Sequence, residues 1–272
     1  MALAFTRRGS GPPLLLLHGI GSARQAWDPV VGRLAERFDV LAVDLPGFGE
    51  SPPLPPGVEP LPSVLAASVA GFLASQGVTA PHVAGNSLGG WVALELAAIE
   101  PVRSLTLLSP AGLWHGETPL YNRISLRTTR WLARHLTALA CRLVRYRAGR
   151  VIILGQTHGQ PARMSAGYAR AAVRAMADCP GFDATMRATE PRCYRAGPPL
   201  DTPVTVAFGS RDRLLLPRQS RHLGELPPDT RVEPLAGCGH VPMADDPGAV
   251  AALITAGASR TRGRAPGSYG MI

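Results

Sequence analysis

The stretch His82-Val-Ala-Gly-Asn-Ser-Leu-Gly-Gly-Trp91 constrains the fold of this chain more than any other stretch. A short apolar run ends in Gly85-Asn-Ser-Leu-Gly89 and passes at once into a helix-like run that starts at Trp91. This order predicts a strand, a tight turn and a helix, with the hydroxyl of Ser87 pushed out at the carboxyl edge of a sheet. The flanking glycines fit such a turn, because a side chain at either position would collide with the neighbouring strand or helix. Ser87 is therefore the candidate nucleophile.

The rest of the chain supplies the alternation of strands and helices that this turn requires. With 30 glycines in 272 residues, the glycine–serine pattern alone is weak, so its context has to carry the argument. Apolar runs predict strands at 3–8, 13–17, 38–44, 82–86, 102–109, 203–208 and 231–235. Helical spacing predicts helices at 23–37, 63–76, 91–99, 218–226 and 247–256, with Ser63 as an N-cap and Gly77 as a C-cap. Continuous apolar strands that alternate with helices are typical of a mostly parallel sheet with helices on both faces.

The alternation stops between about residues 111 and 197. Helices are expected at 123–147 and 165–177, the second capped by Ser165, and the only strand candidate is the short run 151–154. We therefore expect an α/β core formed by 1–112 and 198–258, with a helical cap inserted at 113–197. Residues 259–272 are rich in Gly, Arg and Ser and lack periodic hydrophobic residues, which predicts a disordered tail.

Composition indicates a cytoplasmic protein without a membrane span. The longest aliphatic run, Leu14–Leu17, is far shorter than the roughly 20 residues that a transmembrane helix needs. Arg7-Arg8 suggests a twin-arginine export signal, but the segment Gly9–Pro13 interrupts that pattern. The four cysteines lack the paired spacing of metal ligands or of a disulfide framework, so free thiols and no metal site are expected.

A serine hydroxyl becomes a good nucleophile when a base takes its proton and a carboxylate orients that base. The chain supplies both groups after later strands: Asp212 follows the strand 203–208, and His240 follows the strand 231–235. Parallel strands end at one edge of a sheet, so these two side chains are expected near Ser87. Asp201, Asp245 and Asp246 stay open as alternative partners for His240.

The order Ser, Asp, His resembles that of the α/β-hydrolase superfamily. Five segments resemble its recurring blocks: His18–Gly21, Asp44–Ser51, Gly85–Gly90, Gly209–Asp212 and Gly239–Met243. The resemblance implies an oxyanion hole formed by the backbone N–H groups of Ile20 and Leu88, with His18 holding the loop. It also implies that no cofactor is required.

Within the superfamily, the serine argues against the dehalogenase and epoxide hydrolase branches, which resemble this core but carry aspartate at the turn. The segment Gly85–Gly90 also resembles the carbon–carbon bond hydrolases of aromatic degradation, although Val241 stands where those enzymes usually have tryptophan. We therefore expect a serine hydrolase that cleaves a carboxylic ester or related acyl compound through an acyl-enzyme. The alternatives are a carbon–carbon hydrolase or thioesterase on the same triad, and a non-catalytic receptor on a hydrolase fold.

Other side chains are candidates for supporting roles. Trp27, Trp91 and Val241 are candidate substrate contacts, although tryptophans in such positions are more often core residues. Asp44 is expected to organise its loop, and Asn86 to support the site without entering the chemistry. The remaining histidines are expected to be surface or packed residues: His82, His115, His135, His158 and His222.

All 28 basic residues are arginine, and their excess lies in the predicted cap. Residues 113–197 hold 14 arginines against four acids, a net charge of +10, whereas the rest has a net charge of −1. If 123–147 is one helix, arginines at 123, 127, 130 and 134 face solvent, and leucines at 132, 136, 139 and 143 pack downward. A solvated face is the simpler interpretation. The alternative is a negatively charged partner: an anionic substrate, an acidic carrier protein or an anionic membrane surface. No nucleic-acid partner is expected, and the oligomeric state stays open.

Overall fold

The computed structural model describes residues 2–197 and 200–260 as a central sheet with helices on both faces. The sheet has seven strands in the order β1-β3-β2-β4-β5-β6-β7, with β1 antiparallel and all other pairs parallel. The strands are β1 (Phe5–Arg8), β2 (Pro13–Leu17), β3 (Asp39–Val43), β4 (His82–Asn86), β5 (Ser104–Leu108), β6 (Val204–Gly209) and β7 (Arg231–Leu235). This arrangement confirms the predicted α/β fold.

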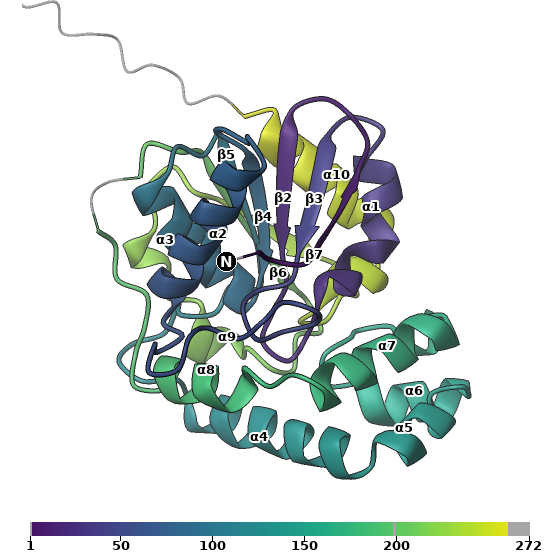
Figure 1. The fold of residues 1–272 in the computed structure, drawn as a ribbon. Coiled ribbons are helices and arrows are strands. Elements are labelled where there is room, and N and C mark those ends of the chain that lie inside the picture. The colour runs from purple at the N-terminus through teal and green to yellow at the C-terminus, as the bar shows by residue number, and fades with distance from the viewer. Residues whose placement is uncertain (1, 198–199, 261–272) are drawn as a thin grey trace, which may run out of the picture.

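The helices divide into those that cover the sheet and those of the central block, which is the segment between β5 and β6 in the chain. The sheet is covered by α1 (Asp28–Leu34), α2 (Pro62–Ser75), α3 (Leu88–Ile99) and α10 (Pro247–Ala258), with short turns η1 (Arg24–Trp27), α9 (Pro217–Ser220), η3 (Leu223–Glu225) and η4 (Pro242–Ala244). The central block holds α4 (Leu120–His135), α5 (Thr137–Leu143), α6 (Arg147–Leu154), η2 (Pro161–Arg163), α7 (Ala166–Ala177) and α8 (Phe182–Thr189). Figure 1 shows α1 and α10 on one face of the sheet and α2 and α3 on the other.

The alternation of side chains along β2 explains why both faces are covered. Leu15 and Leu17 pack with the residues of α2 and α3, whereas Leu14 and Leu16 pack with those of α1 and α10. All four leucines are buried, and the continuous apolar run therefore forms two separate cores.

The helices of the central block lie together beyond the carboxyl ends of the strands (Figure 1). We call α4 to α8 the helical insertion, because they stand between β5 and β6 in the chain. None of the helices in residues 2–197 and 200–260 is long and apolar enough to cross a membrane.

Several helix boundaries differ from those expected. Helix α2 starts at Pro62, so Ser63 lies in its first turn instead of capping it, because proline's fixed φ suits the first helical position. Gly77 (φ +64°) and Ser165, whose Oγ accepts the N–H of Tyr168, lie at helix ends as predicted. The expected helices 23–37 and 218–226 are each two short pieces: η1 with α1, and α9 with η3.

The prediction of one continuous helix over 123–147 is wrong, because this segment is broken into separate helices. The prediction of a strand at 151–154 is also wrong, because these residues are part of α6. The break between α4 and α5 falls at Leu136, whose φ of −117° and ψ of 22° leave the helical region. A second break separates α5 from α6. These breaks invalidate the predicted opposition of an arginine face and a leucine face.

The arginines of α4 are largely engaged by the protein itself. Arg123 pairs with Glu117, and Arg127 pairs with Glu190 at 2.8 Å. Arg130 donates to the carbonyl oxygens of Met176, Ala177 and Cys179 at the end of α7, where the helix leaves carbonyls without partners. The leucines expected to pack downward are instead 40% to 51% exposed: Leu132, Leu136, Leu139 and Leu143.

At the carboxyl end, α10 stops at Ala258, and Arg260 still contacts the core. Its guanidinium donates to the carbonyl of Val204 at 2.7 Å and to that of Asp229 at 3.1 Å. The predicted tail therefore starts too early at 259, and its residues 261–272 lie outside the described residues.

Candidate active site

Ser87 occupies a strained turn between β4 and α3. Its φ of 53° and ψ of −118° are a conformation that costs a residue with a side chain on the order of 1–3 kcal/mol. Glycines make the turn possible: a Cβ at Gly85 would lie 2.3 Å from the carbonyl oxygen of Gly89, and a Cβ at Gly89 would lie 2.3 Å from that of Leu17. The sequence-based explanation of both glycines is therefore confirmed.

Asp212 and His240 are hydrogen-bonded to each other, with 3.0 Å between Oδ2 of the aspartate and Nδ1 of the imidazole. The other oxygen of Asp212 accepts the backbone N–H groups of Leu214 and Leu215, both at 2.9 Å. Burial raises the pKa of Asp212, but the neighbouring His240 and these hydrogen bonds outweigh it and hold that pKa below its usual range. Since the anionic carboxylate only accepts, Nδ1 carries the proton, and Nε2 of a neutral His240 is an acceptor.

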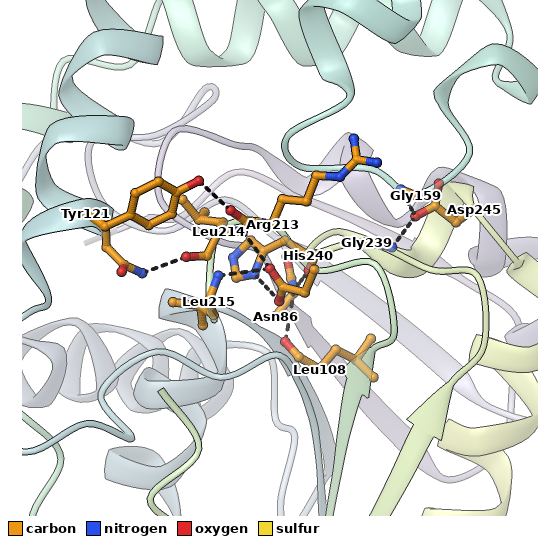
Figure 2. Close-up of polar contacts among 12 residues, drawn as sticks. Asn86, Leu108, Tyr121, Gly159, Arg213, Leu214, Leu215, Gly239, His240 and Asp245 are labelled. Carbon is orange, nitrogen blue, oxygen red and sulfur yellow. Dashed lines mark hydrogen bonds and ion pairs between the residues drawn. The ribbon is translucent and has the colours of Figure 1, made fainter. Parts of the chain in front are cut away.

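Asn86, the residue before Ser87, connects the end of β5 to the loop that carries His240. Its Nδ2 donates to the carbonyl oxygens of Leu108 and His240, each at 2.9 Å (Figure 2). Because the amide bridges the end of β5 and the histidine loop, Asn86 supports the site as predicted.

The loop after β2 is held against Ser87 by His18. Nδ1–H of His18 donates to the carbonyl of Gly19 at 2.8 Å, and Nε2 accepts the N–H of Leu45 at 3.0 Å. This pattern requires a neutral ring, and burial lowers the pKa of His18. A Cβ at Gly19 would lie 3.1 Å from Cβ of Ser87, so the loop packs directly on the turn.

Asp44 organises the adjacent loop, as expected. Its carboxylate accepts the backbone N–H groups of Arg24, at 2.6 Å, and Glu50, at 3.0 Å, and it pairs with the Arg24 guanidinium. All of these contacts are structural, and Asp44 is not among the residues that line the cavity described next.

A cavity of about 390 Å³ extends from Ser87 and His240 into the helical insertion. Ile20 and Val241, which the sequence singled out, also line it. Most of its wall is apolar and comes from the insertion: Leu126, Leu132, Ala133, Leu136, Leu139, Ala140, Leu143, Ile152, Ile153, Leu154, Ala171, Ala172, Val173, Ala175 and Met176. Sequence reasoning missed this wall, because the leucine spacing that marks it is equally typical of ordinary packing.

The two tryptophans predicted as candidate substrate contacts lie in the core instead. Trp27 is fully buried with the residues of α1 and α10, and Trp91 packs edge-to-face on Trp114 and donates to Glu95 at 3.0 Å. Neither lines the cavity, because η1 and α3 turn these side chains toward the faces of the sheet. Of the three candidate contacts, only Val241 reaches the cavity.

The carboxylate of Asp245 accepts hydrogen bonds from backbone N–H groups and is not the partner of His240. It accepts the N–H groups of Gly239 and Gly159, each at 2.7 Å (Figure 2). It also accepts the N–H of Gln160 at 2.7 Å. It therefore joins the histidine loop to the segment after α6.

Two further hydrogen bonds join the Asp212 loop to the insertion. Tyr121 Oη donates to the carbonyl of Arg213 at 2.7 Å (Figure 2). The side-chain amide of Asn122 donates to the carbonyl of Leu214 at 3.0 Å.

His158 also lines the cavity and is buried, a placement that the sequence did not distinguish from other packed histidines. Burial lowers its pKa to about 3, and its Nδ1 lies 2.9 Å from Oγ1 of Thr157. In the described part of the chain, no group of three or more His, Cys, Asp or Glu side chains is placed to hold a metal ion.

Comparison with known proteins places this chain in a family. Residues 14–253 match the model of the alpha/beta hydrolase family. An uncharacterized protein of Mycobacterium tuberculosis is 31% identical over 263 residues, which cover 90% of this chain and 74% of that protein. A pimeloyl-[acyl-carrier protein] methyl ester esterase of Aeromonas hydrophila is 44% identical over 111 residues, 41% of this chain and 42% of that protein.

Among solved structures, that of a bacterial membrane phospholipase A superposes with a TM-score of 0.68 and 28% identity, covering 93% of this chain and 81% of that one. The family model spans most of the chain, and the sheet order agrees with the fold that the sequence blocks resemble. The chain belongs to the alpha/beta hydrolase family.

Proposed function

We propose that this protein is a serine hydrolase that cleaves a carboxylic ester with an apolar acyl group through an acyl-enzyme. One observation carries the proposal: Ser87, on its strained turn, lines the same cavity as His240, whose Nδ1 is bonded to Asp212. Two similar proteins have the names of ester hydrolases, the pimeloyl methyl ester esterase and the phospholipase A, which supports the reaction class.

In the proposed acylation step, Nε2 of His240 takes the proton of Ser87 as Oγ attacks the ester carbonyl carbon. The ester C=O electron pair moves onto oxygen, and Asp212 stabilises the imidazolium that forms. When the tetrahedral intermediate collapses, the imidazolium gives its proton to the departing alkoxide, and the ester C–O bond breaks. An acyl-Ser87 ester and a free alcohol remain.

The oxyanion is assigned to the backbone N–H groups of Leu88 and Ile20. Leu88 is the first residue of α3, so its N–H has no partner within the helix and points from the positive end of the helix dipole. Ile20 lies on the loop that His18 holds against Ser87. Such a donor typically lowers the barrier by about 2.7–4 kcal/mol.

Deacylation reverses these roles with water as nucleophile. His240 takes a proton from water, the hydroxide attacks the acyl carbon, and the proton returns to Ser87 as the acid leaves. Only the neutral imidazole of His240 can accept the proton of Ser87.

The helical insertion is proposed to act as a cap over this site, in accordance with the predicted division into core and cap. The cavity wall that it supplies is largely aliphatic, which favours an extended hydrocarbon acyl chain over a polar one. A thioester or a vinylogous diketone would react with the same three residues, and a receptor would leave them unused.

Labelling with a fluorophosphonate probe tests the proposal. Wild-type protein should be labelled at Ser87, and Ser87→Ala should lose both labelling and turnover, with kcat lower by on the order of 10⁶-fold. Ser22→Ala is the matched control, because Ser22 lines the same cavity but lies outside the turn. A protein that is not labelled, or a Ser87→Ala variant that keeps its activity, would contradict the assignment.

The substrate class is tested with acyl esters of graded chain length, matched thioesters and a vinylogous diketone. We expect kcat/KM to be highest for an ester and to rise with acyl length until the cavity is filled. Faster cleavage of the thioester or of the diketone would instead assign one of those reactions.

A further inference from the structure

The exposed hydrophobic side chains of this protein are concentrated on the helical insertion. Among the described residues, 14 large hydrophobic side chains are exposed, and 11 of them lie between Leu120 and Ile152. The others are scattered over the core: Val58, Ile99 and Val232. Scattered apolar residues are normal on a protein surface, whereas a concentration of them indicates an interaction site.

Five of these exposed side chains also line the cavity. We call this set the rim: Leu132, Leu136, Leu139, Leu143 and Ile152. Each rim residue is between 40% and 82% exposed, and each also lines the cavity that contains Ser87 and His240. The cavity therefore opens to the outside through an apolar mouth, on the side of α4, α5 and α6.

The rim stands in a strongly basic segment. Residues 118–177 contain 11 arginines and no aspartate or glutamate. Four of these arginines are exposed at the end of α4, on α5 and around the start of α6, and none has an ion-pair partner within residues 2–197 and 200–260: Arg134, Arg142, Arg145 and Arg147. They differ in this respect from Arg123 and Arg127, whose charges are paired.

An apolar face beside unpaired cations fits one kind of partner best. A second copy of the chain would bring its own arginines against these, and like charges repel. The acidic side chains of a partner protein would pair with the arginines, but that protein would need a separate apolar surface to contact the rim. An anionic lipid surface offers both hydrocarbon for the rim and phosphate for the arginines at the same boundary.

We propose that the rim and the four arginines dock the protein reversibly on an anionic lipid bilayer, with the mouth of the cavity against the membrane. No helix of the described residues could span the bilayer, so the contact is interfacial. A lipid acyl chain would pass from the leaflet along the rim into the cavity without crossing water. Docking does not depend on the chemistry, but the delivery of an ester rests on the proposed function.

Sedimentation with vesicles tests the docking directly. The Ser87→Ala full chain is mixed with vesicles of phosphatidylcholine alone, or of phosphatidylcholine with phosphatidylglycerol, so that no turnover alters the lipid. We expect binding to the anionic vesicles that weakens as salt is raised, and much weaker binding to the neutral ones. Equal binding to both vesicles, or no binding to either, would overturn the proposal.

Substitutions locate the contact. Replacing Arg142, Arg145 and Arg147 by glutamine should lower the partition coefficient on anionic vesicles by about fivefold per arginine. The matched control removes Arg33, Arg37 and Arg103, three exposed arginines of the core, and should change binding far less. The triple variant at 142, 145 and 147 does not touch the cavity and should hydrolyse a soluble short-chain ester at the wild-type rate. Equal losses in the two triple variants would overturn the assignment of the surface.

Leu139→Asp and Ile152→Asp test the contribution of the apolar rim to membrane docking. Each should abolish vesicle binding, whereas Ile99→Asp, at a 54% exposed position on α3, should not. Far-UV circular dichroism and thermal unfolding verify that each variant is folded. Rim variants that are folded and bind like wild type would overturn the proposal.

Two further readouts distinguish membrane docking from dimerisation and from ester hydrolysis. A stable dimer in light scattering without lipid, abolished by Ile152→Asp, would assign the rim to a second copy and overturn membrane docking. If the fluorophosphonate probe does not label wild-type protein at Ser87, the proposed hydrolase function is contradicted, but the vesicle result is unaffected. The two proposals can therefore fail independently.

Discussion

Oδ2 of Asp245 accepts the backbone N–H of Gly159 at 2.7 Å, across 86 residues of sequence. The same oxygen accepts the N–H of Gly239, and Oδ1 accepts that of Gln160, both at 2.7 Å. One carboxylate therefore fixes the segment after α6 relative to the loop that carries His240. This side chain takes no part in the proposed chemistry, yet it helps to position both the helical insertion and the histidine.

Asp245→Ala should destabilise the protein and slow ester hydrolysis together. One buried N–H donor and two partly buried ones lose a charged acceptor, which predicts a loss of about 3 kcal/mol in the free energy of unfolding. The neighbouring Asp246→Asn is the control, because asparagine still caps α10 through the N–H of Ala249. Urea unfolding and kcat measure the two effects, and an Asp245→Ala variant as stable as Asp246→Asn would contradict this role.

Asp212→Asn should reduce kcat by as much as about 10⁴-fold, since an amide in place of the carboxylate favours the wrong imidazole tautomer. KM should change little, because Asp212 does not line the cavity. The free energy of unfolding should also fall at neutral pH, because the depressed pKa of Asp212 stabilises the folded state above the usual aspartate range. That stabilisation is lost as pH falls through the folded pKa, so wild type and variant should converge in acid. A variant with full activity would mean that another carboxylate orients His240.

Gly89→Ala should cost about 3 kcal/mol of stability and remove activity, because the new methyl would lie 2.3 Å from the carbonyl oxygen of Leu17. Gly71→Ala is the opposite case, since a Cβ there meets no atom within 4 Å and the position lies inside α2. It should stabilise the protein by about 0.5–1 kcal/mol. Thermal unfolding of both variants measures the difference, and similar melting temperatures would argue against the tight turn.

His158 should make the protein sensitive to mild acid. Its folded-state pKa is lowered to about 3 by burial, so below the ordinary histidine value the unfolded chain binds a proton that the folded protein does not. This contribution is fully present above about pH 6.5 and declines with falling pH, by about 2 kcal/mol at pH 5.

His158→Leu should remove that part of the pH dependence of the free energy of unfolding. Urea titrations of variant and wild type at pH 7 and pH 5 are compared. His135→Leu is the control, since that histidine is exposed. An unchanged slope in His158→Leu would show that His158 already titrates normally.

The sequence by itself determined the sheet, the turn at Ser87 and the placement of Asp212 and His240 at the same edge of that sheet. Each depends on short-range or directional rules: glycines that a tight turn requires, apolar runs that form buried strands, and parallel strands that end at one edge. It also determined the excess of arginine in the central block, which is a matter of counting.

Only the tertiary structure decided which faces of that block meet the rest of the protein. Helical spacing shows that leucines share a stripe, but not whether the stripe packs on the core or surrounds an opening, because that depends on the neighbours of the helix. The helix breaks at Leu136, Arg130 is bound by the end of α7, and the leucines expected to pack on the core are exposed.

For the same reason, the sequence could not decide which carboxylate pairs with His240: Asp201, Asp212, Asp245 or Asp246. Nor could it decide whether Trp27 and Trp91 line a cavity. A loop's path, not its sequence neighbours, decides what its carboxylate reaches, and a buried tryptophan looks the same in sequence whether it lines a cavity or fills a core.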